Sequence, residues 1–299
     1  MRIGLFLFPA NIDGFVDDAR AAAADGFPSV WIPQIFGHDA LTLLAIAGRE
    51  VSGIEFGTAV VPTYPRHPMM LAQQALTTNT ACGGRFTLGI GLSHQVVIEG
   101  MYGMSFDKPA IHMRDYLTIL GALLRDRKVN HAGKTLTARA QIDVGGAPAG
   151  APPVLIAALA PRMLELAGTL ADGTITWMTG PDTVESHINP TMREAAAKAG
   201  RPQPRTVVGL PVCVTDDADA ARARAATEFV VYGQLPSYRA MLDREGAAGP
   251  ADVAIVGDEA AVRAGIERVA ASGADDLVAN LFGSADEKAR TRKLLTTLL

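Results

Sequence analysis

Short apolar segments alternate with amphipathic segments along the whole chain. A short apolar run bounded by turn residues predicts a strand buried on both faces, and apolar positions spaced by three and four residues predict a helix. This pattern predicts eight strands, at 2–8, 29–33, 54–61, 86–91, 154–158, 174–178, 206–214 and 276–281.

A helical pattern follows each predicted strand. The predicted helices cover 12–25, 39–49, 68–81, 111–126, 161–171, 182–199, 217–245 and 284–298, and a further amphipathic helix covers 257–273. Three segments interrupt the alternation. We expect a long loop at 92–110, a hairpin within 129–144 and a turn-rich surface loop at 145–153.

Eight strand–helix units in 299 residues predict a closed parallel (β/α)8 TIM barrel with insertions after strands four and seven. We expect a single domain over residues 1–299, because the alternation resumes after each interruption. An open doubly wound sheet is the alternative. It is disfavoured because the turn after the first strand reads FPANID and lacks a glycine-rich fingerprint.

Composition narrows the range of partners and locations. The chain is 48% hydrophobic and carries a net charge of −4, which disfavours disorder and gives no basis for binding nucleic acid or an anionic membrane. Cys82 and Cys213 lie far apart in apolar runs, so we expect buried free thiols. Neither a signal peptide nor an apolar run long enough to span a bilayer is apparent, and we expect a reducing cytoplasm.

The sequence lacks the motifs of several kinds of catalytic site. None of the six histidines pairs with another at a spacing of four, and no acidic cluster accompanies them, so we predict no metal. The sequence also lacks a Gly-x-Ser-x-Gly elbow, a P-loop and a Cys-x-x-Cys pair. We expect His131 and His187 at the surface, and His67 as a local helix cap.

Active sites of parallel barrels lie at the carboxyl ends of the strands. His94 stands at that end of the fourth strand and opens the longest predicted loop. It is either a histidine that pins this loop or a proton donor or cofactor partner, since its pKa near neutrality suits either of the latter roles. Spacing alone leaves both interpretations open.

Two further features lie at this end of the barrel. The segment AALAPRML (157–164) has small side chains before a helix start, where backbone amides can bind an anion. The alternative is that small residues merely ease strand–helix packing. Trp177 ends the sixth strand and is either a core aromatic or the wall of a pocket for a flat ring.

Taken together, these stretches resemble the luciferase-like monooxygenase superfamily, and within it the oxidoreductases that depend on the deazaflavin coenzyme F420. The resemblance extends over nearly the whole chain, from MRIGLF to DLVANLFG. It rests on GTAVVPTYPRHPMMLAQQALT (57–77), GGRFTLGIGLSHQ (83–95), APPVLIAALAPRMLELAGTLADGTITWM (151–178), VVYGQLPSYRAMLDREG (230–246) and VAIVGDEAAVRAGIERVAASGADDLV (253–278).

The resemblance implies a set of cofactor contacts. In relatives the third strand ends in a bulge whose non-proline cis peptide backs the cofactor ring, and this maps onto Ala59–Val60, next to Thr58. The loop beside the ring's reactive edge maps onto Ser93 and His94. Where many relatives have an aspartate after strand two, this chain has Gln34. The cofactor phosphate would lie against the start of the fifth helix, and the ring-side wall would include Trp177; the phosphate segment comprises Ala157, Ala158, Leu159, Ala160 and Arg162.

The implied activity is hydride transfer between coenzyme F420 and a small organic substrate. His94 would be the catalytic proton donor. The 95–108 loop, Tyr232, Gln234 and Tyr238 would shape the substrate pocket together with Trp177. Two alternatives are an FMN-dependent monooxygenase of the same superfamily and a non-catalytic flavin-binding barrel. Relatives are often homodimers, so a homodimer is expected.

Overall fold

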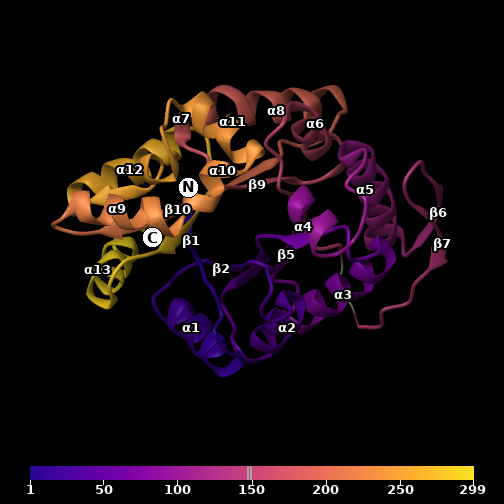
Figure 1. The fold of residues 1–299 in the computed structure, drawn as a ribbon. Coiled ribbons are helices and arrows are strands. Elements are labelled where there is room, and N and C mark those ends of the chain that lie inside the picture. The colour runs from indigo at the N-terminus through magenta and orange to yellow at the C-terminus, as the bar shows by residue number, and fades with distance from the viewer. Residues whose placement is uncertain (147, 149) are drawn as a thin grey trace.

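The computed structural model describes residues 1–146, 148 and 150–299. Eight parallel strands close into a barrel, because each pairs with the next and β12 pairs back with β1 (Figure 1). This confirms the (β/α)8 prediction and rules out the open sheet. The barrel strands are β1 (Arg2–Phe6), β2 (Ser29–Ile32), β3 (Glu55–Thr58), β5 (Phe86–Gly91), β8 (Val154–Ile156), β9 (Gly173–Trp177), β10 (Arg205–Val214) and β12 (Asp276–Leu281).

Helices surround this ring (Figure 1). Most begin and end within a few residues of the predicted positions, and none in the described part of the chain is long and apolar enough to cross a bilayer. The surrounding helices are α1 (Ile12–Ala24), α2 (Ala40–Glu50), α3 (Pro68–Ala81), α5 (Pro109–Asp126), α6 (Pro161–Leu170), α7 (Pro181–Thr183), α8 (Asn189–Lys198), α12 (Glu259–Ala271) and α13 (Ala285–Thr296).

Two predicted elements are divided. The strand predicted at 54–61 breaks after β3, and the short β4 (Val61–Pro62) pairs with β5 instead. The helix predicted at 182–199 consists of α7, a π-helical turn over Val184–Ile188 and α8. Pro190 lies near the start of α8 and has no N–H for a regular helical bond, which accounts for an irregular turn just before it.

The insertion after β5 differs from prediction. The segment 92–110 contains a short helix, α4 (Gln95–Gly100), where we expected only loop. The predicted hairpin is confirmed as β6 (Lys128–Ala132) paired with β7 (Thr137–Gln141). The predicted loop at 145–153 includes residues 147 and 149, which lie outside the described residues.

The insertion after β10 is built from three helices. These are α9 (Ala218–Glu228), α10 (Val230–Gln234) and α11 (Pro236–Glu245), where the pattern predicted one long helical region. Pro236 at the start of α11 interrupts the run, because proline cannot continue a helix that is already formed. An unpredicted strand, β11 (Ile255–Gly257), then pairs with the end of β10. In Figure 1, α4 and α10 lie over the ring of strands.

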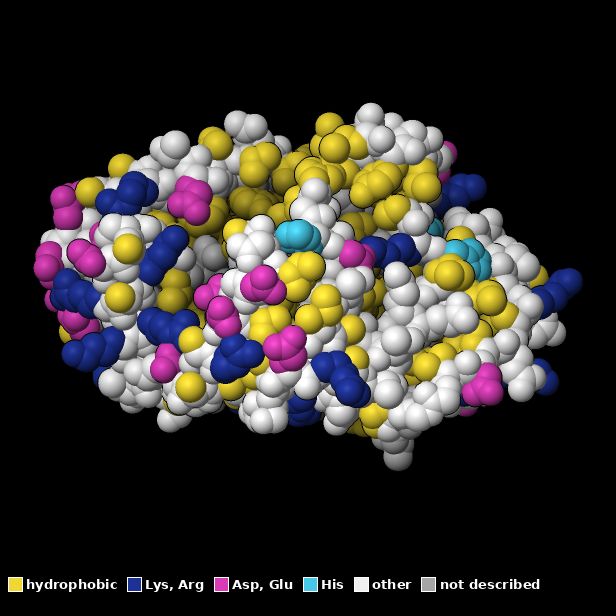
Figure 2. All heavy atoms as spheres, turned by 90° about the horizontal axis from the view of Figure 1, so that it is seen from below, with side chains coloured by type: hydrophobic (Ala, Val, Ile, Leu, Met, Phe, Trp, Pro, Cys, Tyr) yellow, Lys and Arg dark blue, Asp and Glu magenta, His cyan; other side chains and the backbone are white. Residues whose placement is uncertain are grey.

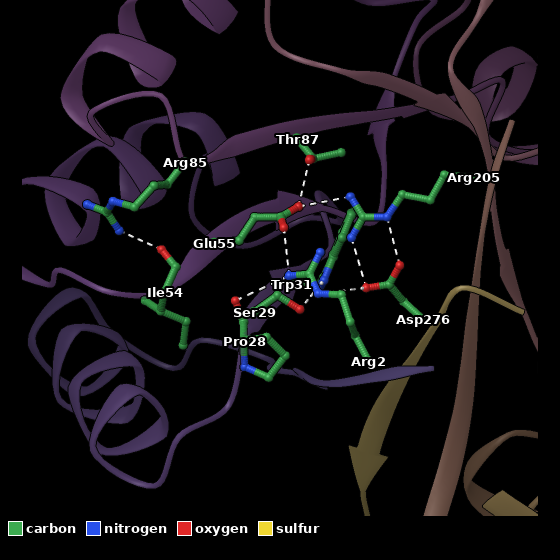
Figure 3. A network of polar contacts seen from close by, with 10 residues as sticks. All are labelled: Arg2, Pro28, Ser29, Trp31, Ile54, Glu55, Arg85, Thr87, Arg205 and Asp276. Atoms are coloured by element: carbon green, nitrogen blue, oxygen red, sulfur yellow. Dashed lines mark hydrogen bonds and ion pairs between the residues drawn. The ribbon is translucent and has the colours of Figure 1, made fainter. Parts of the chain in front are cut away.

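An ionic network closes the amino end of the barrel (Figure 3). Arg205 donates through Nε and Nη2 to the Asp276 carboxylate at 2.7 and 2.9 Å, and through Nη1 to Glu55 at 3.0 Å. Arg2 donates to the other Glu55 oxygen at 2.8 Å, and Thr87 donates to Glu55 at 2.7 Å. Burial opposes the charged form of Glu55, but these partners, Arg205 foremost, hold its pKa below the ordinary value.

Side chains fill the middle of the barrel above this network. The interior cluster consists of Phe6, Trp31, Leu155, Ile175, Val207 and Val278. Cζ of the Arg205 guanidinium lies 5.6 Å from the centre of the Trp31 ring. Ala59 and Val60 pack against the cluster from the carboxyl side. The open space for a ligand therefore lies at the carboxyl ends of the strands.

Candidate active site

The bulge after β3 forms the floor of the carboxyl end. The Ala59–Val60 peptide is cis, as the resemblance implied. The Ala59 N–H donates to the Ile32 carbonyl at 2.8 Å, and the Gln34 N–H donates to the Val60 carbonyl at 3.4 Å. The Thr58 hydroxyl donates to the Gly89 carbonyl and accepts from the Gly89 N–H, both at 2.8 Å. The bulge is thus held from β2 on one side and from β5 on the other.

Two glycines of β5 make room for this bulge. A Cβ on Gly89 would lie 1.9 Å from the Thr58 carbonyl oxygen. A Cβ on Gly91 would lie 2.7 Å from Val60 Cγ2 and 3.2 Å from the Ala157 Cβ. The alternating glycines of FTLGIG therefore allow a close approach of strands, a signal that periodicity alone does not reveal.

A cavity of about 60 Å³ lies over the bulge, and we call it the ring cavity. The indole Nε1 of Trp177, in its wall, is buried and has no hydrogen-bond partner among the described residues. Tyr238 is also in its wall. Ligand pockets are commonly about 300–1,000 Å³, so a flavin-sized ring would fill this cavity and extend beyond it. The lining residues are Phe6, Ala59, Val60, Ala157, Leu159, Ile175, Thr176, Trp177 and Tyr238.

An aromatic row crosses the mouth. Trp177 stacks on Phe6 with ring centres 5.2 Å apart and meets Tyr232 edge-on at 5.9 Å. Tyr232 meets Tyr238 at 5.2 Å, and Tyr238 lies 5.8 Å from the His94 ring. The structure therefore brings together three of the predicted pocket residues and His94. Gln234, the remaining predicted side chain, is exposed and lines neither cavity described here.

His94 occupies the N-cap position of α4, but its side chain forms no hydrogen bond to the helix. Its ring is half-buried, and burial lowers its pKa, so the neutral imidazole predominates at pH 7. Ser93 before it has a left-handed backbone with φ of 62°. Because the ring faces Tyr238 and is not engaged in capping, it is available to a ligand in the mouth.

The α6 N-terminus offers unpaired backbone donors. Ala160 is its N-cap and supplies no capping side chain, and Pro161 follows at the first position. Ala158 is held by its N–H to Thr174 Oγ1 at 3.3 Å. The exposed Arg162 lies in the same turn. Helix N-termini attract anions through free N–H groups and the helix dipole.

Three predicted residues have structural partners of their own. The Gln34 carbonyl oxygen accepts from the Ala40 N–H at 2.7 Å, so this side chain helps to begin α2. His187 is buried against Leu159, whose carbonyl lies 2.8 Å from Nε2. The prediction that His187 lies at the surface is wrong, because the π-helical turn directs it under the phosphate segment. His67 caps α3 as predicted, through Nδ1 and the Met69 N–H.

His131 of β6 contacts a residue of α5, and His112 belongs to α5 itself. His131 is partly buried and approaches Asp115 at 3.2 Å. His112, which the sequence did not single out, is buried, contacts Thr63 at 3.1 Å and stacks on Tyr64 at 4.0 Å. Burial lowers its pKa to about 4 despite the nearby Asp115. Within the described ranges, no three His, Cys, Asp or Glu side chains gather as a metal site.

A second and larger cavity adjoins the ring cavity, with a volume of about 660 Å³. It lies over the ends of β1 and β12, between α1, α13 and the α9–α10 segment. Phe6 and Trp177 line both cavities. We call the larger one the Asn280 chamber, after the polar side chain of β12 in its wall. Sequence reasoning missed it, although the alternation of DLVANL places Asn280 on the same face as Val278.

The rim around both cavities is apolar. Figure 2 shows hydrophobic side chains gathered around a hollow along the upper edge of the molecule. Such a concentration marks a contact or binding surface more often than a chance distribution. Nine exposed large hydrophobic residues follow the carboxyl ends of β1, β2, β5 and β10: Phe8, Ile35, Phe36, Val96, Met101, Tyr102, Met104, Val230 and Val231.

Comparison with known proteins identifies the family. Residues 1–296 match the family model described as luciferase-like monooxygenase, so the chain belongs to that family. It is 31% identical to a 5,10-methylenetetrahydromethanopterin reductase of Methanolobus tindarius, over 71% of this chain and 64% of that protein. The chain thus spans less than two thirds of that relative's length.

Two further proteins resemble the chain. One, from Mycobacterium tuberculosis, is named as a candidate coenzyme F420-dependent oxidoreductase and is 32% identical, over 71% of this chain and 66% of that protein. The other is a solved F420-dependent secondary alcohol dehydrogenase in complex with an F420–acetone adduct. It superposes with a TM-score of 0.82 over 98% of this chain and 97% of that one, at 18% identity, which establishes a shared fold.

Proposed function

We propose that the protein is an oxidoreductase that transfers a hydride between the deazaflavin coenzyme F420 and a small organic substrate. The observation that carries the proposal is the ring cavity, whose floor is the Ala59–Val60 bulge held between β2 and β5. The names of the mycobacterial relative and of the dehydrogenase with the F420–acetone adduct support this choice of cofactor.

The residues present fit such a cofactor. The floor at Ala59 and Val60 is small and apolar, Thr58 holds it in place through Gly89, and the unpartnered Trp177 Nε1 offers a hydrogen bond in the wall. The backbone N–H of Gln34 holds the Val60 carbonyl of the bulge. We therefore propose that Gln34 supports the cofactor ring mainly by fixing the bulge. When bound, the deazaflavin would supply two electrons as hydride; the protein would supply binding, orientation and proton delivery.

The α6 N-terminus would hold the cofactor phosphate. The free amides near Leu159 and Ala160 point out of the helix start, and Arg162 adds a positive charge. Ala157 and Ala158 keep the approach unobstructed, since neither has a side chain beyond Cβ. The carbonyl of Leu159 is occupied by His187, which helps to fix the loop.

His94 would move the proton. Burial keeps its imidazole neutral at pH 7, which suits acceptance of a proton from an alcohol or amine during oxidation. In the reducing direction the protonated imidazole would donate to the substrate. Ser93, with its left-handed backbone, sets the direction in which this loop leaves β5.

A turnover screen tests the proposal. Activated alkenes, ketones, imines and sugar phosphates are supplied with reduced F420, and oxidation of the cofactor is followed by its absorbance. We expect turnover with at least one class and a reduced rate in His94→Gln. Turnover with reduced FMN and oxygen only would establish the monooxygenase alternative, and binding without any turnover would favour a non-catalytic barrel.

We further propose a cytoplasmic homodimer built from the single domain over 1–299. The apolar rim and the frequent dimerisation of relatives support a dimer. The buried free thiols of Cys82 and Cys213 suit a reducing compartment. Light scattering during size-exclusion chromatography gives the molecular mass directly, and a mass near 31.4 kDa would contradict the dimer.

A further inference from the structure

Asn280 is a mostly buried residue of β12 whose side chain lines the Asn280 chamber. Only 7% of the residue is exposed, and within the described part of the chain its side chain forms no hydrogen bond. An amide carries two N–H donors and one acceptor oxygen, and without a protein partner these groups are free to bind a molecule in the chamber. A polar side chain in a mostly apolar cavity wall points to a ligand that completes its hydrogen bonds.

The position of Asn280 directs it into the mouth. Val278 belongs to the interior cluster with Phe6, and side chains two residues apart on a strand share a face. Asn280 therefore faces inward, one layer nearer the carboxyl end. The backbone of β12 is fixed at this point by pairing with Pro211 of β10.

The wall around Asn280 is apolar near the barrel and charged only at its outer end. Beside the amide lie Phe6, Trp177, Phe229 and Leu281. The outer lining has two carboxylates and two basic groups, so it has no net charge: Asp18, Glu228, Lys288 and Arg292. Arg292 is paired with Asp25 through Nε at 2.6 Å, whereas its Nη2 has no partner among the described residues. The lining as a whole is neutral, so the chamber offers an anion no net electrostatic attraction.

We infer that the Asn280 chamber binds the body of the substrate, and that this body is apolar and carries a neutral hydrogen-bonding group, a carbonyl or hydroxyl, that pairs with Asn280. The inference rests on the proposed function, because Phe6 and Trp177 border both cavities and the reacting end would pass them toward the ring cavity and His94. The volume of about 660 Å³ lies within the range of small-molecule sites.

A pair of rigid probes tests this selectivity in the full-length protein without cofactor. 2-Adamantanone has an apolar body and one neutral oxygen, and adamantane-1-carboxylate has a similar body with a negative charge. Binding is followed by quenching of Trp177 emission, and the Trp177→Phe protein supplies the background from Trp31, the other tryptophan. We expect the ketone to bind at least about tenfold more tightly than the carboxylate. Equal or tighter binding of the carboxylate would overturn the inferred substrate class.

Asn280→Leu tests the residue itself. We expect ketone affinity to fall by about tenfold. The melting temperature should stay the same or rise, because the removed amide has no partner in the fold. Unchanged ketone affinity would show that Asn280 does not contact the ligand, and a marked loss of thermal stability would show that it has a structural role. Either result would overturn its assignment. Asn130→Leu, at an exposed position on β6, is the matched control and should leave ketone binding unchanged.

Failure of the chamber inference can be distinguished from failure of the proposed function. If F420 binds and the ketone does not, the chamber inference fails and the redox proposal stands. If the ketone binds as expected but F420 does not, the redox proposal fails and the chamber remains a neutral-ligand site.

Discussion

The hydroxyl of Thr58 and the backbone of Gly89 exchange two hydrogen bonds of 2.8 Å across the gap between β3 and β5. The hydroxyl is both donor and acceptor, and both strands are buried there. It replaces the ladder bonds that β3 gives up where the bulge begins. Thr58 thereby fixes the position of the Ala59–Val60 peptide, on which the proposed cofactor site depends.

Thr58→Val should lower the free energy of unfolding by about 1–3 kcal/mol, because it leaves buried groups of Gly89 unpaired. Thr58→Ser keeps the hydroxyl and should recover most of that loss. Denaturant unfolding measures both. Thr77→Val, which removes an exposed helix hydroxyl, is the control and should change stability by less than about 0.5 kcal/mol. A Thr58→Val protein as stable as the control would mean that the bulge is held by other contacts.

Gly91→Ala should weaken cofactor binding by about tenfold or more, because the new methyl would lie 2.7 Å from Val60 Cγ2 and push the bulge into the ring cavity. Gly145→Ala is the matched control, since a Cβ there meets no atom within 4 Å. Equilibrium titration of both proteins with F420 measures the effect. Equal affinities in the two variants would argue against a ring seated on Val60.

Ala160→Asp should separate stability from binding. A carboxylate at the uncapped N-cap of α6 satisfies a free N–H and should add about 0.5–1 kcal/mol of stability. The same charge should repel the cofactor phosphate and lower affinity, whereas Ala160→Asn caps without the charge. Melting curves and F420 titrations are compared for the two variants. Tighter F420 binding by Ala160→Asp than by Ala160→Asn would place the phosphate elsewhere.

His112 should make stability depend on pH. Burial lowers its pKa from 6.5 to about 4 in the folded protein, so the unfolded chain binds more protons between these values. Stability should therefore fall as the pH falls from 6.5 to 4, and this one group accounts for about 3 kcal/mol of the loss. His112→Phe keeps a ring against Tyr64 and should remove the part of the pH dependence that comes from His112. If the free energy of unfolding changes with pH in the same way in the wild type and in the variant, His112 is not the cause.

His94 should give the catalytic rate a pH dependence of a defined sign. Because burial lowers its pKa, substrate reduction, which uses the protonated ring, should speed up as the pH falls below neutrality. Oxidation, which uses the neutral ring, should slow over the same range. The kcat profile of His94→Gln should lose both trends, and an unchanged profile would remove His94 from proton transfer.

The barrel was predictable because parallel strands that are buried on both faces need apolar side chains at nearly every position. Such strands appear in the sequence as continuous apolar runs. Strand 86–91 and helix 68–81 agree with the structure at both ends. The elements that were not predicted are those whose formation depends on tertiary contacts. The helix α4 is too short to show a period, and β11 is a three-residue strand visible only through its pairing with β10.

The candidate site divides in the same way. Residues at strand ends, such as Ala59 and Trp177, could be placed from the barrel rule and the resemblance. Asn280 and His112 could not be placed, because their roles depend on which hydrogen-bond partners lie near them in the folded protein. Only a complete description of neighbours distinguishes an unpaired amide from one satisfied by its own strand.

The most direct measurement is an equilibrium titration of the purified protein with F420 and, separately, with FMN. We expect saturable one-to-one binding of F420 that Gly91→Ala weakens and Gly145→Ala does not, with FMN binding more weakly. Tight binding of FMN with no response to F420 would contradict the assignment of a deazaflavin to the site over Ala59–Val60.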